Sequence, residues 1–255
     1  MTVSLKGVCS ALGAPAPVSV CRDILGFKGK KVGPRLDDAR PQPLLSLNGF
    51  VAGLRDLHFD VQLILAGVDV FSGSDDDALD YAVYRLRDIY KDAKVGVGRI
   101  TRQPLTSASS LGHVTVRTKA DLDATGKDLT SDGAFIPVVI PANMNVTTTL
   151  PSGIVAGIAG QTPTPGPCSP RTGSGARSSV VGLSGETTGR TLAHEIGHFF
   201  GIPHPSPPDN SLMTQTNSVT SGNAFTAVTI NPADIITIRT HCTMLDGLQI
   251  PEVNL

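Results

Sequence analysis

The stretch at 194–204 reads HEIGHFFGIPH and constrains the fold more than any other part of the sequence. It holds three of the chain's six histidines and one of its three glutamates. His194 and His198 are four residues apart, so on one helix both imidazoles point to the same side. Gly201 favours the left-handed conformation that ends a helix, and Pro203 prevents the helix from resuming. The chain must therefore turn back, which brings His204 toward the other two histidines.

Three histidines that converge in this way match a catalytic zinc site, in which three protein ligands leave the fourth position to water. Glu195 follows the first ligand directly, and we expect its carboxylate beside the zinc-bound water rather than on the metal. It can accept the proton of that water as general base and pass it to the leaving amine. We therefore predict one zinc ion held by His194, His198 and His204, with Glu195 as the catalytic residue. The alternative is a chance occurrence of two histidines and a glutamate on a buried helix. That alternative gives no reason for His204 to lie at its fixed offset.

The stretch resembles the signature H-E-x-x-H-x-x-G-x-x-H of the metzincin clan of zinc metallopeptidases. A second signature of that clan is a methionine turn beneath the metal, and NSLMTQ at 210–215 is similar to it. The resemblance implies a zinc-dependent endopeptidase, with Met213 as a hydrophobic base under the ligands and not itself a ligand. The specific motifs span 194–213, whereas over about 57–248 the resemblance is one of element order.

The sequence around the motif shares features with more than one branch of the clan. The short link after His204 resembles the matrixins in length, and Pro205 is what serralysins carry at that position. The approach to the helix is more similar to the adamalysin (reprolysin) branch. Astacins and serralysins place a tyrosine ligand two residues after the methionine, and here that residue is Gln215. We therefore predict no fifth protein ligand.

The chain has four cysteines, which suit either two disulfides in an oxidising compartment or four free thiols. The resemblance to adamalysins implies a disulfide between Cys168 and Cys242, and Cys9 and Cys21 would then pair with each other. We expect a secreted, extracellular protein, although no secretory signal is visible at the N-terminus.

Hydrophobic periodicity predicts a strand–helix–strand opening and hence a mixed or parallel sheet. Ser74 and Asp77 resemble a capping pair at the start of the first helix, and Pro137 favours a sheet edge or a bulge. The predicted strands are 59–71, 94–100, 134–140, 153–160 and 178–185, and the predicted helices are 74–93, 187–200 and 231–245.

These elements and the resemblance together predict an α+β fold of the metzincin-like zincin type. A twisted mixed five-stranded sheet with long helices would form an N-terminal subdomain, and a small, mostly irregular C-terminal subdomain would end in a helix. The catalytic domain would span 56–255, divided into 56–201 and 202–255. Residues 1–55 would form an N-terminal extension, either an accessory segment or a pro-segment.

In metzincins the edge strand before the active-site helix binds an extended substrate by strand addition. Chain order makes 153–160 the candidate here, with Gly157, Ile158 and Ala159 as substrate-binding residues. An ordinary buried strand is the alternative. The predicted partners are protein or peptide substrates. A net charge of −1 without a basic run argues against nucleic acid, no apolar run approaches the ~18 residues of a membrane span, and we expect a monomer.

Two other functions stay open. A narrowly specific proteolytic toxin or effector would share the chemistry but fail on general substrates such as casein. A non-catalytic zinc-containing binding module is the second, and Glu195 argues against it because a structural zinc needs no base. The acidic run SGSDDDALD could suggest calcium, but it lacks the ligand pattern of an EF-hand loop, and helix capping explains it better. His58, His113 and His241 have no companion at ligand spacing.

Overall fold

The structure is a computed structural model. It describes residues 57–130, 135–149, 155–163, 165–166, 178–185, 187–207, 209, 211–215 and 228–247. The predicted N-terminal extension lies outside these residues, as do Cys9, Cys21 and Cys168. What the sequence predicts for them stays a prediction.

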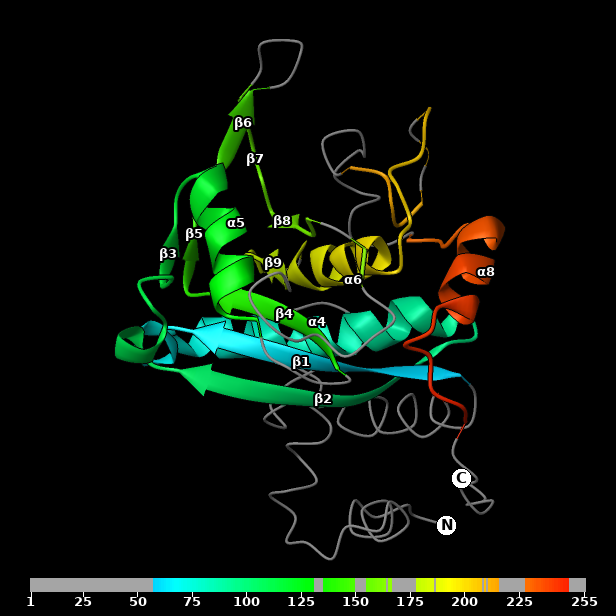
Figure 1. The fold of residues 1–255 in the computed structure, drawn as a ribbon, viewed down its shortest axis with the longest axis horizontal. Coiled ribbons are helices and arrows are strands. Elements are labelled where there is room, and N and C mark those ends of the chain that lie inside the picture. The colour runs from blue at the N-terminus through cyan, green and yellow to red at the C-terminus, as the bar shows by residue number, and fades with distance from the viewer. Residues whose placement is uncertain are drawn as a thin grey trace, which may run out of the picture.

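Five strands form one sheet in the order β2–β1–β4–β9–β8 (Figure 1). Neighbouring strands from β2 to β9 run parallel, and β8 at the edge runs antiparallel to β9. The strands are β1 (His58–Ala66), β2 (Gly96–Leu105), β4 (Ile136–Pro141), β8 (Gly160–Gln161) and β9 (Ser179–Val181). The predicted α+β fold with a mixed five-stranded sheet is therefore confirmed.

The opening unit runs from β1 through α4 (Gly73–Lys91) to β2, as the periodicity predicts. The N-cap of the helix is Ser72. Its hydroxyl accepts a hydrogen bond from the Asp75 N–H, and the Asp75 carboxylate accepts one from the Ser72 N–H. The prediction of Ser74 and Asp77 as the capping pair was wrong. Each serine has an aspartate three residues later, so the local pattern alone does not choose between them.

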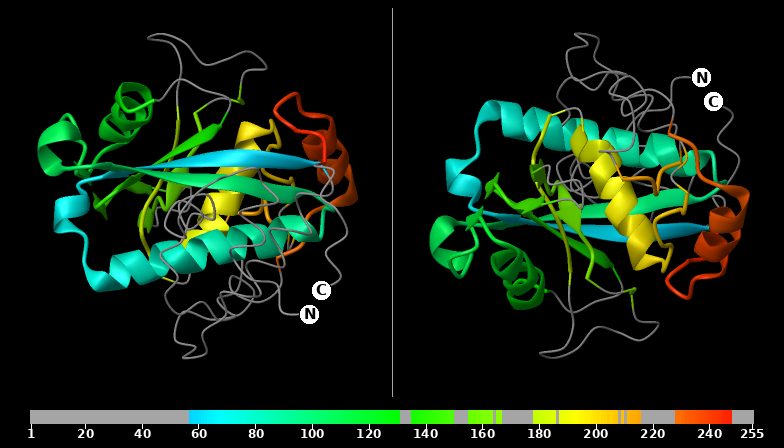
Figure 2. Two further views of the ribbon diagram at one scale, coloured as in Figure 1. Left: turned by 90° about the horizontal axis from the view of Figure 1, so that it is seen from below. Right: turned by 90° about the horizontal axis from the view of Figure 1, so that it is seen from above.

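The two faces of β1 pack against different helices (Figure 2). Side chains from Phe59 to Leu65 at alternate positions enter a core with α4 and with α6 (Thr187–Phe199). Ile64 and Ala66 enter a smaller core with α5 (Lys119–Asp128) on the other side. The first face of β1 is apolar along its length, whereas the second carries Asp60 and Gln62 before it becomes apolar at Ile64 and Ala66.

The helix α6, which carries the histidine motif, packs against α4. Gly189 lies at the crossing, where a side chain would collide with Ala82 and Arg85 of α4. The hydroxyl of Tyr90 in α4 donates to the carbonyl of Ala193 at 3.0 Å, one residue before the first histidine of the motif. The long helix α4 therefore helps to set where the motif lies relative to the sheet.

Pro137 does not mark a sheet edge, and that prediction was wrong. It lies in β4, between β1 and β9, with Gln62 of β1 as its register partner. Pairing of β4 with β9 begins only at Val138. A proline lacks the N–H of a ladder bond, and it is tolerated here because β9 does not yet lie alongside it.

The C-terminal helix α8 (Pro232–Thr240) begins with Asn231 as N-cap and Pro232 at the first helical position, as predicted. It ends at Thr240, five residues before the predicted end at 245. Leu245 instead forms an isolated antiparallel bridge with His58, the first residue of β1. This long-range pairing takes the end of the segment away from the helix axis and ties it to the sheet.

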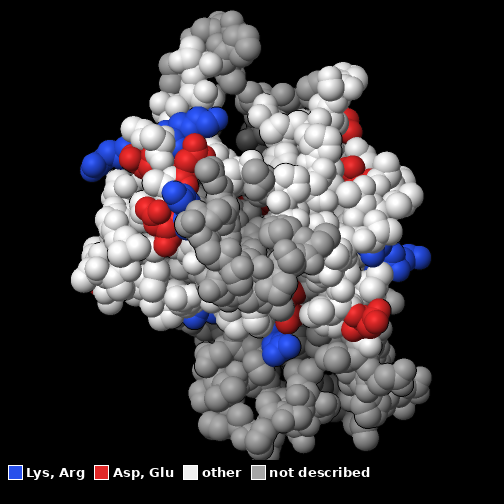
Figure 3. Space-filling model, in the orientation of Figure 1, with Lys and Arg blue, Asp and Glu red and all other residues white. Residues whose placement is uncertain are grey.

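The remaining elements lie around the end of the sheet near α5 or project from the body. β6 (Thr147–Thr149) and β7 (Val155–Gly157) form a projecting antiparallel ribbon (Figure 1). The short elements are η1 (Val68–Val70), η2 (Ser107–Ser109), β3 (Thr115–Val116) and β5 (Asn143–Met144). On the face shown in Figure 3, acidic and basic side chains of the described residues are interspersed. Within the described ranges, no helix has the length and apolar character to cross a membrane.

Candidate metal centre

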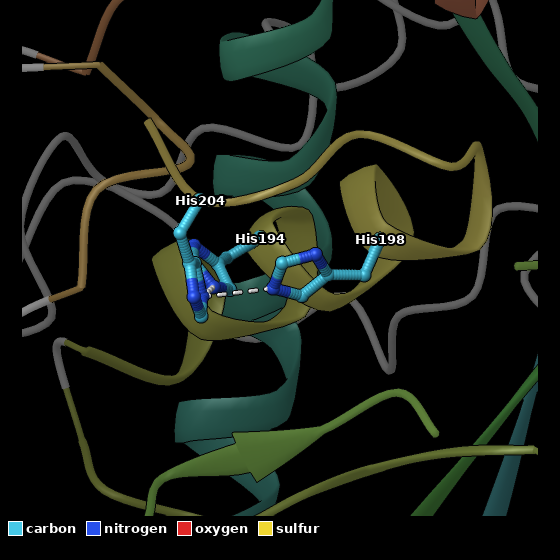
Figure 4. Close-up of side chains that lie close together, drawn as sticks. All are labelled: His194, His198 and His204. Atoms are coloured by element: carbon cyan, nitrogen blue, oxygen red, sulfur yellow. Dashed lines mark hydrogen bonds between the residues drawn. The ribbon is translucent and has the colours of Figure 1, made fainter. Parts of the chain in front are cut away.

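The end of α6 brings the three histidines of the motif together. His194 and His198 lie on one side of the helix, as their spacing requires (Figure 4). Gly201 has φ of +89°, and its N–H bonds to the carbonyl of His198 at 2.9 Å. This left-handed glycine ends the helix in a Schellman turn. The chain then reverses and carries His204 back toward the helix.

The Nε2 atoms of the three rings meet at one point. Nε2 of His204 lies 3.1 Å from that of His194 and 3.0 Å from that of His198, as the dashed lines in Figure 4 mark. Around a tetrahedral zinc ion with Zn–N bonds of 2.0–2.1 Å, two ligand nitrogens are about 3.3–3.4 Å apart. The three nitrogens would admit such an ion after a slight outward movement.

Backbone carbonyls determine which nitrogen carries the proton in two of these rings. The carbonyl oxygen of Leu212 accepts from Nδ1 of His194 at 2.8 Å, and that of Ile202 accepts from Nδ1 of His198 at 2.7 Å. A neutral imidazole with its proton on Nδ1 has a lone pair on Nε2. Lone pairs therefore face one another where the rings meet, and a cation satisfies them. Ligating histidines usually have such a carbonyl partner.

Exposure increases along the three ligands. His194 is buried, His198 is half-buried and His204 is exposed. Burial lowers the pKa of all three histidines, and that of His194 to about 3. The rings are therefore neutral at physiological pH, which is the form that binds a metal ion. The side of the centre at His204 is open to solvent.

The carboxylate of Glu195, the residue after His194, is buried and is held by the edge of the sheet. The Thr162 hydroxyl, directly after β8, lies 2.8 Å from Oε2 of Glu195 and 2.8 Å from the backbone oxygen of the same residue. Gly160 leaves the space that the carboxylate needs, because a Cβ there would lie 2.8 Å from Cγ and Oε1 of Glu195. Residues 160 and 162 are two positions apart in an extended segment, so they face the same side.

Burial raises the pKa of Glu195 to about 7, and the hydrogen bond from Thr162 acts in the opposite direction. A carboxyl group with a pKa near the working pH can both accept and release a proton. The helix α6 therefore carries two of the three side chains that could bind a metal and, one residue after the first of them, a buried carboxyl group that could transfer a proton. The role of Glu195 as general base stays a prediction.

Met213 is buried against α6, and its role as a hydrophobic base under the metal ligands stays a prediction. Its side chain is 1% exposed, and its sulfur lies against Gly197, where a Cβ would collide with it. The residue before it, Leu212, supplies the carbonyl that orients His194. The methionine turn therefore contacts the ligand helix through a side chain and through the main chain.

The residues predicted to bind substrate do not lie in the edge strand itself. Gly157 belongs to β7, which pairs with β6 in the separate ribbon. The N–H of Ile158 and the carbonyl of Ala159 are already hydrogen-bonded to other backbone groups. The sheet edge is formed by Gly160–Gln161, slightly further along the chain. A substrate role for the three predicted residues stays a prediction.

The other predicted features lie away from the centre or outside the described residues. His113 lies within 3.0 Å of Asp128 and of Thr125 through its two ring nitrogens. His241 packs near Phe199 and Phe200, the two buried aromatic residues that follow the second ligand. The predicted partner of Cys242 lies outside the described residues, so the disulfide pairing stays a prediction.

Sequence reasoning missed Thr162, which contacts Glu195, and Arg190, which contacts the 211–214 segment. Arg190 lies one helical turn before His194, at the same spacing that made His198 a candidate, and it is buried. That spacing was a usable signal. Thr162 gave no signal, because it stands in a run of Thr, Pro and Gly that is typical of a loop.

No protein-family model matches this chain, and no curated protein matches it. The fold is similar to that of metalloproteinase-II from Bacteroides fragilis, with 13% sequence identity and a TM-score of 0.49. The match covers 91% of this chain, which spans 60% of the length of that protein. At this level of similarity, function has to be inferred from the site itself.

Proposed function

We propose that this chain is a zinc-dependent endopeptidase of the metzincin type. The observation that carries the proposal is the convergence of His194, His198 and His204. The buried Glu195 follows the first of them directly along α6. Three neutral imidazoles with an exposed side suit a catalytic zinc ion better than a structural one, which usually has four protein ligands.

When bound, zinc would act as a Lewis acid toward the scissile carbonyl and make water acidic enough to lose a proton near pH 7. The residues of the chain perform the proton transfers. Glu195 takes the proton of the attacking water and delivers it to the nitrogen of the leaving amine. Thr162 holds Oε2 of that carboxylate, which leaves less freedom for the group to turn away. Burial raises the pKa of Glu195 to about 7, so the group can accept and release a proton near neutral pH.

The substrate class follows from the sheet edge next to this carboxylate. β8 is the last strand of the sheet, and Gly160 at its start lies against Glu195. An extended peptide can add to a sheet edge through main-chain hydrogen bonds. We expect protein or peptide substrates to bind there, with Gly157, Ile158 and Ala159 shaping the approach from the β7 side.

The proposal extends to the setting of the protein. A secreted monomer with the Cys168–Cys242 pair agrees with the motif-level resemblance to adamalysins. The pairing of Cys9 with Cys21 and the role of residues 1–55, accessory or pro-segment, belong to the same proposal. Mass spectrometry of the non-reduced, digested protein tests the cysteine pairs directly, and free thiols at all four positions would contradict them.

The experiment that tests the function compares the wild type with E195Q on a quenched peptide library and on casein, with bound zinc quantified in both. Glutamine keeps the size of the side chain but cannot act as a base. We expect about one zinc ion per chain in both proteins and cleavage only by the wild type. H113A, altered at a histidine away from the centre, should cut like the wild type. Cleavage by E195Q at the wild-type rate, or a wild type without zinc, would contradict the proposal; cleavage of few peptides and no casein would indicate a narrow effector-type specificity.

A further inference from the structure

Arg190 is a buried cation directed at the methionine turn. Its side chain projects from α6, and the residue is 4% exposed. One terminal nitrogen of its guanidinium lies 2.9 Å from the carbonyl oxygen of Thr214, 3.3 Å from that of Ser211 and 3.4 Å from that of Leu212. The guanidinium therefore reaches three backbone oxygens within four consecutive residues of the turn.

The position of this arginine is costly unless it has a specific task. Removing a charge from water is unfavourable unless hydrogen bonds replace the lost hydration. Among the described residues, the hydrogen-bond partners of Arg190 are all backbone carbonyls, and no carboxylate pairs with it. The hydrogen bonds of Arg190 therefore stabilise the main chain of the turn and not an ion pair.

One side of α6 contacts the turn at three places. Arg190, His194 and Gly197 are spaced four and three residues apart, which places them along one face of a helix. Arg190 binds the carbonyls, the ring of His194 donates to Leu212, and Gly197 receives the sulfur of Met213. The carbonyl of Leu212 is shared, since it lies 2.8 Å from the ring nitrogen of His194 and 3.4 Å from the guanidinium.

We propose that Arg190 is a positioning residue for the metal centre, which fixes the methionine turn and thereby the orientation of His194 before the metal ion binds. Loss of the arginine frees the carbonyls of 211–214, so the acceptor of the His194 ring is no longer held in place. The ring of His194 must then be oriented when the metal binds, and the free energy this costs lowers the metal affinity. This inference rests on the proposed zinc site but not on the peptidase activity.

The test is the zinc affinity of the metal-free full chain, measured by competition with a chromophoric chelator. R190M keeps the length and apolar stem of the side chain and removes its donors. We expect R190M to bind zinc about 10–100-fold more weakly than the wild type, the range typical of lost outer partners of metal ligands. R190K keeps a cationic donor on a shorter side chain, which brings it less close to these carbonyls, so its affinity should fall by a smaller factor.

Arg87 offers a matched control. It is also buried, projects from α4 and donates to two backbone carbonyls, at 3.3 Å to Val97 and 3.1 Å to Gly98. These two carbonyls belong to β2. R87M should lower the urea midpoint of the metal-free protein, as R190M does, and leave the zinc affinity unchanged.

The outcomes are separable. Zinc affinity of R190M equal to that of the wild type, or reduced no more than in R87M, overturns the role of Arg190. If R190M does not fold, R190K decides, and a wild-type affinity in R190K overturns the role. A wild type that binds zinc but cuts no peptide contradicts the proposed peptidase and leaves this inference standing, whereas a wild type without zinc overturns both.

Discussion

The sulfur of Met213 fills the space that a side chain at Gly197 would need. Alanine favours a helix by roughly 1 kcal/mol over glycine, so G197A would stabilise α6 if nothing opposed it. We expect the reverse, because Met213 is buried and has little room to move. Overpacking of this kind costs about 1–3 kcal/mol. Urea unfolding of the metal-free protein measures the change.

A double-mutant cycle checks that cause. M213A alone removes buried contacts and should destabilise the protein by about 2–5 kcal/mol. Combined with G197A, the total cost should be smaller than the sum, because the new methyl group then enters the vacated space. Additive costs would show that Gly197 and Met213 do not interact.

Removal of the Thr162 hydroxyl should slow the chemical step and leave substrate binding intact. Valine has nearly the shape of threonine but cannot donate to Oε2 of Glu195. We expect kcat of T162V to fall about 10-fold, the range of one lost hydrogen bond to a charged group, with KM and zinc content unchanged. T162S, which keeps the hydroxyl, should recover most of kcat. An equal loss in T162S and T162V would show that packing, and not the hydrogen bond, matters at this position.

The buried carboxyl of Glu195 should make its own contribution to stability dependent on pH. Its pKa is raised to about 7 from the usual 4.5, so the folded state favours the protonated form. That contribution is fully present below pH 4.5 and is lost as pH rises through 7. In the chelator-treated protein, the free energy of unfolding of E195Q should therefore rise relative to that of the wild type between pH 5 and 8. The rise should reach up to about 3 kcal/mol, taken as the pKa difference times 1.36. A difference that stays constant over this range would contradict the burial effect.

The comparison with E195Q is needed because the histidines act in the opposite sense. Burial lowers the pKa of His194 to about 3, so its contribution is present above pH 6.5 and is lost as pH falls below that value. The wild-type curve alone combines both effects. The histidines are common to the two proteins, and their contribution cancels in the difference.

Two of the ligands should differ in what they contribute besides metal binding. His204 is exposed, whereas His194 is buried and donates to Leu212. H204A should lose zinc with little change in the unfolding free energy of the metal-free protein. H194A should lose zinc and also cost about 1–3 kcal/mol, because a buried carbonyl loses a donor. Equal stability of the two metal-free variants would show that the Leu212 contact is not stabilising.

The local part of the centre could be predicted from the sequence, because short-range geometry determines it. The spacing of His194 and His198 fixes their common side, and Gly201 fixes the end of the helix, as its φ of +89° shows. The partners of these residues could not be predicted. Thr162 meets Glu195 across 33 positions, and Arg190 meets the turn across more than 20. Such contacts depend on how the elements pack, which periodicity does not encode.

The same limit explains the predictions of the fold that were wrong. The strands β1, β2, β4 and β9 followed from apolar runs, but the place of each strand in the sheet did not. Pro137 suggests an edge by its own chemistry, yet β4 lies between β1 and β9. The proline is tolerated there because pairing with β9 begins one residue later. Leu245 continues the helical pattern of α8, yet pairing with His58 removes it from the helix.

The carbonyls that orient His194 and His198 belong to the main chain, at Leu212 and Ile202. Every amino acid has this oxygen, so a substitution at either position leaves the acceptor in place while the chain keeps its course. Gly201 has no such freedom, because its left-handed φ sets that course. Selection on the centre therefore acts on the path of the backbone more than on the side chains around the ligands. Surrounding sequences can diverge widely in evolution while the geometry of the metal ligands persists.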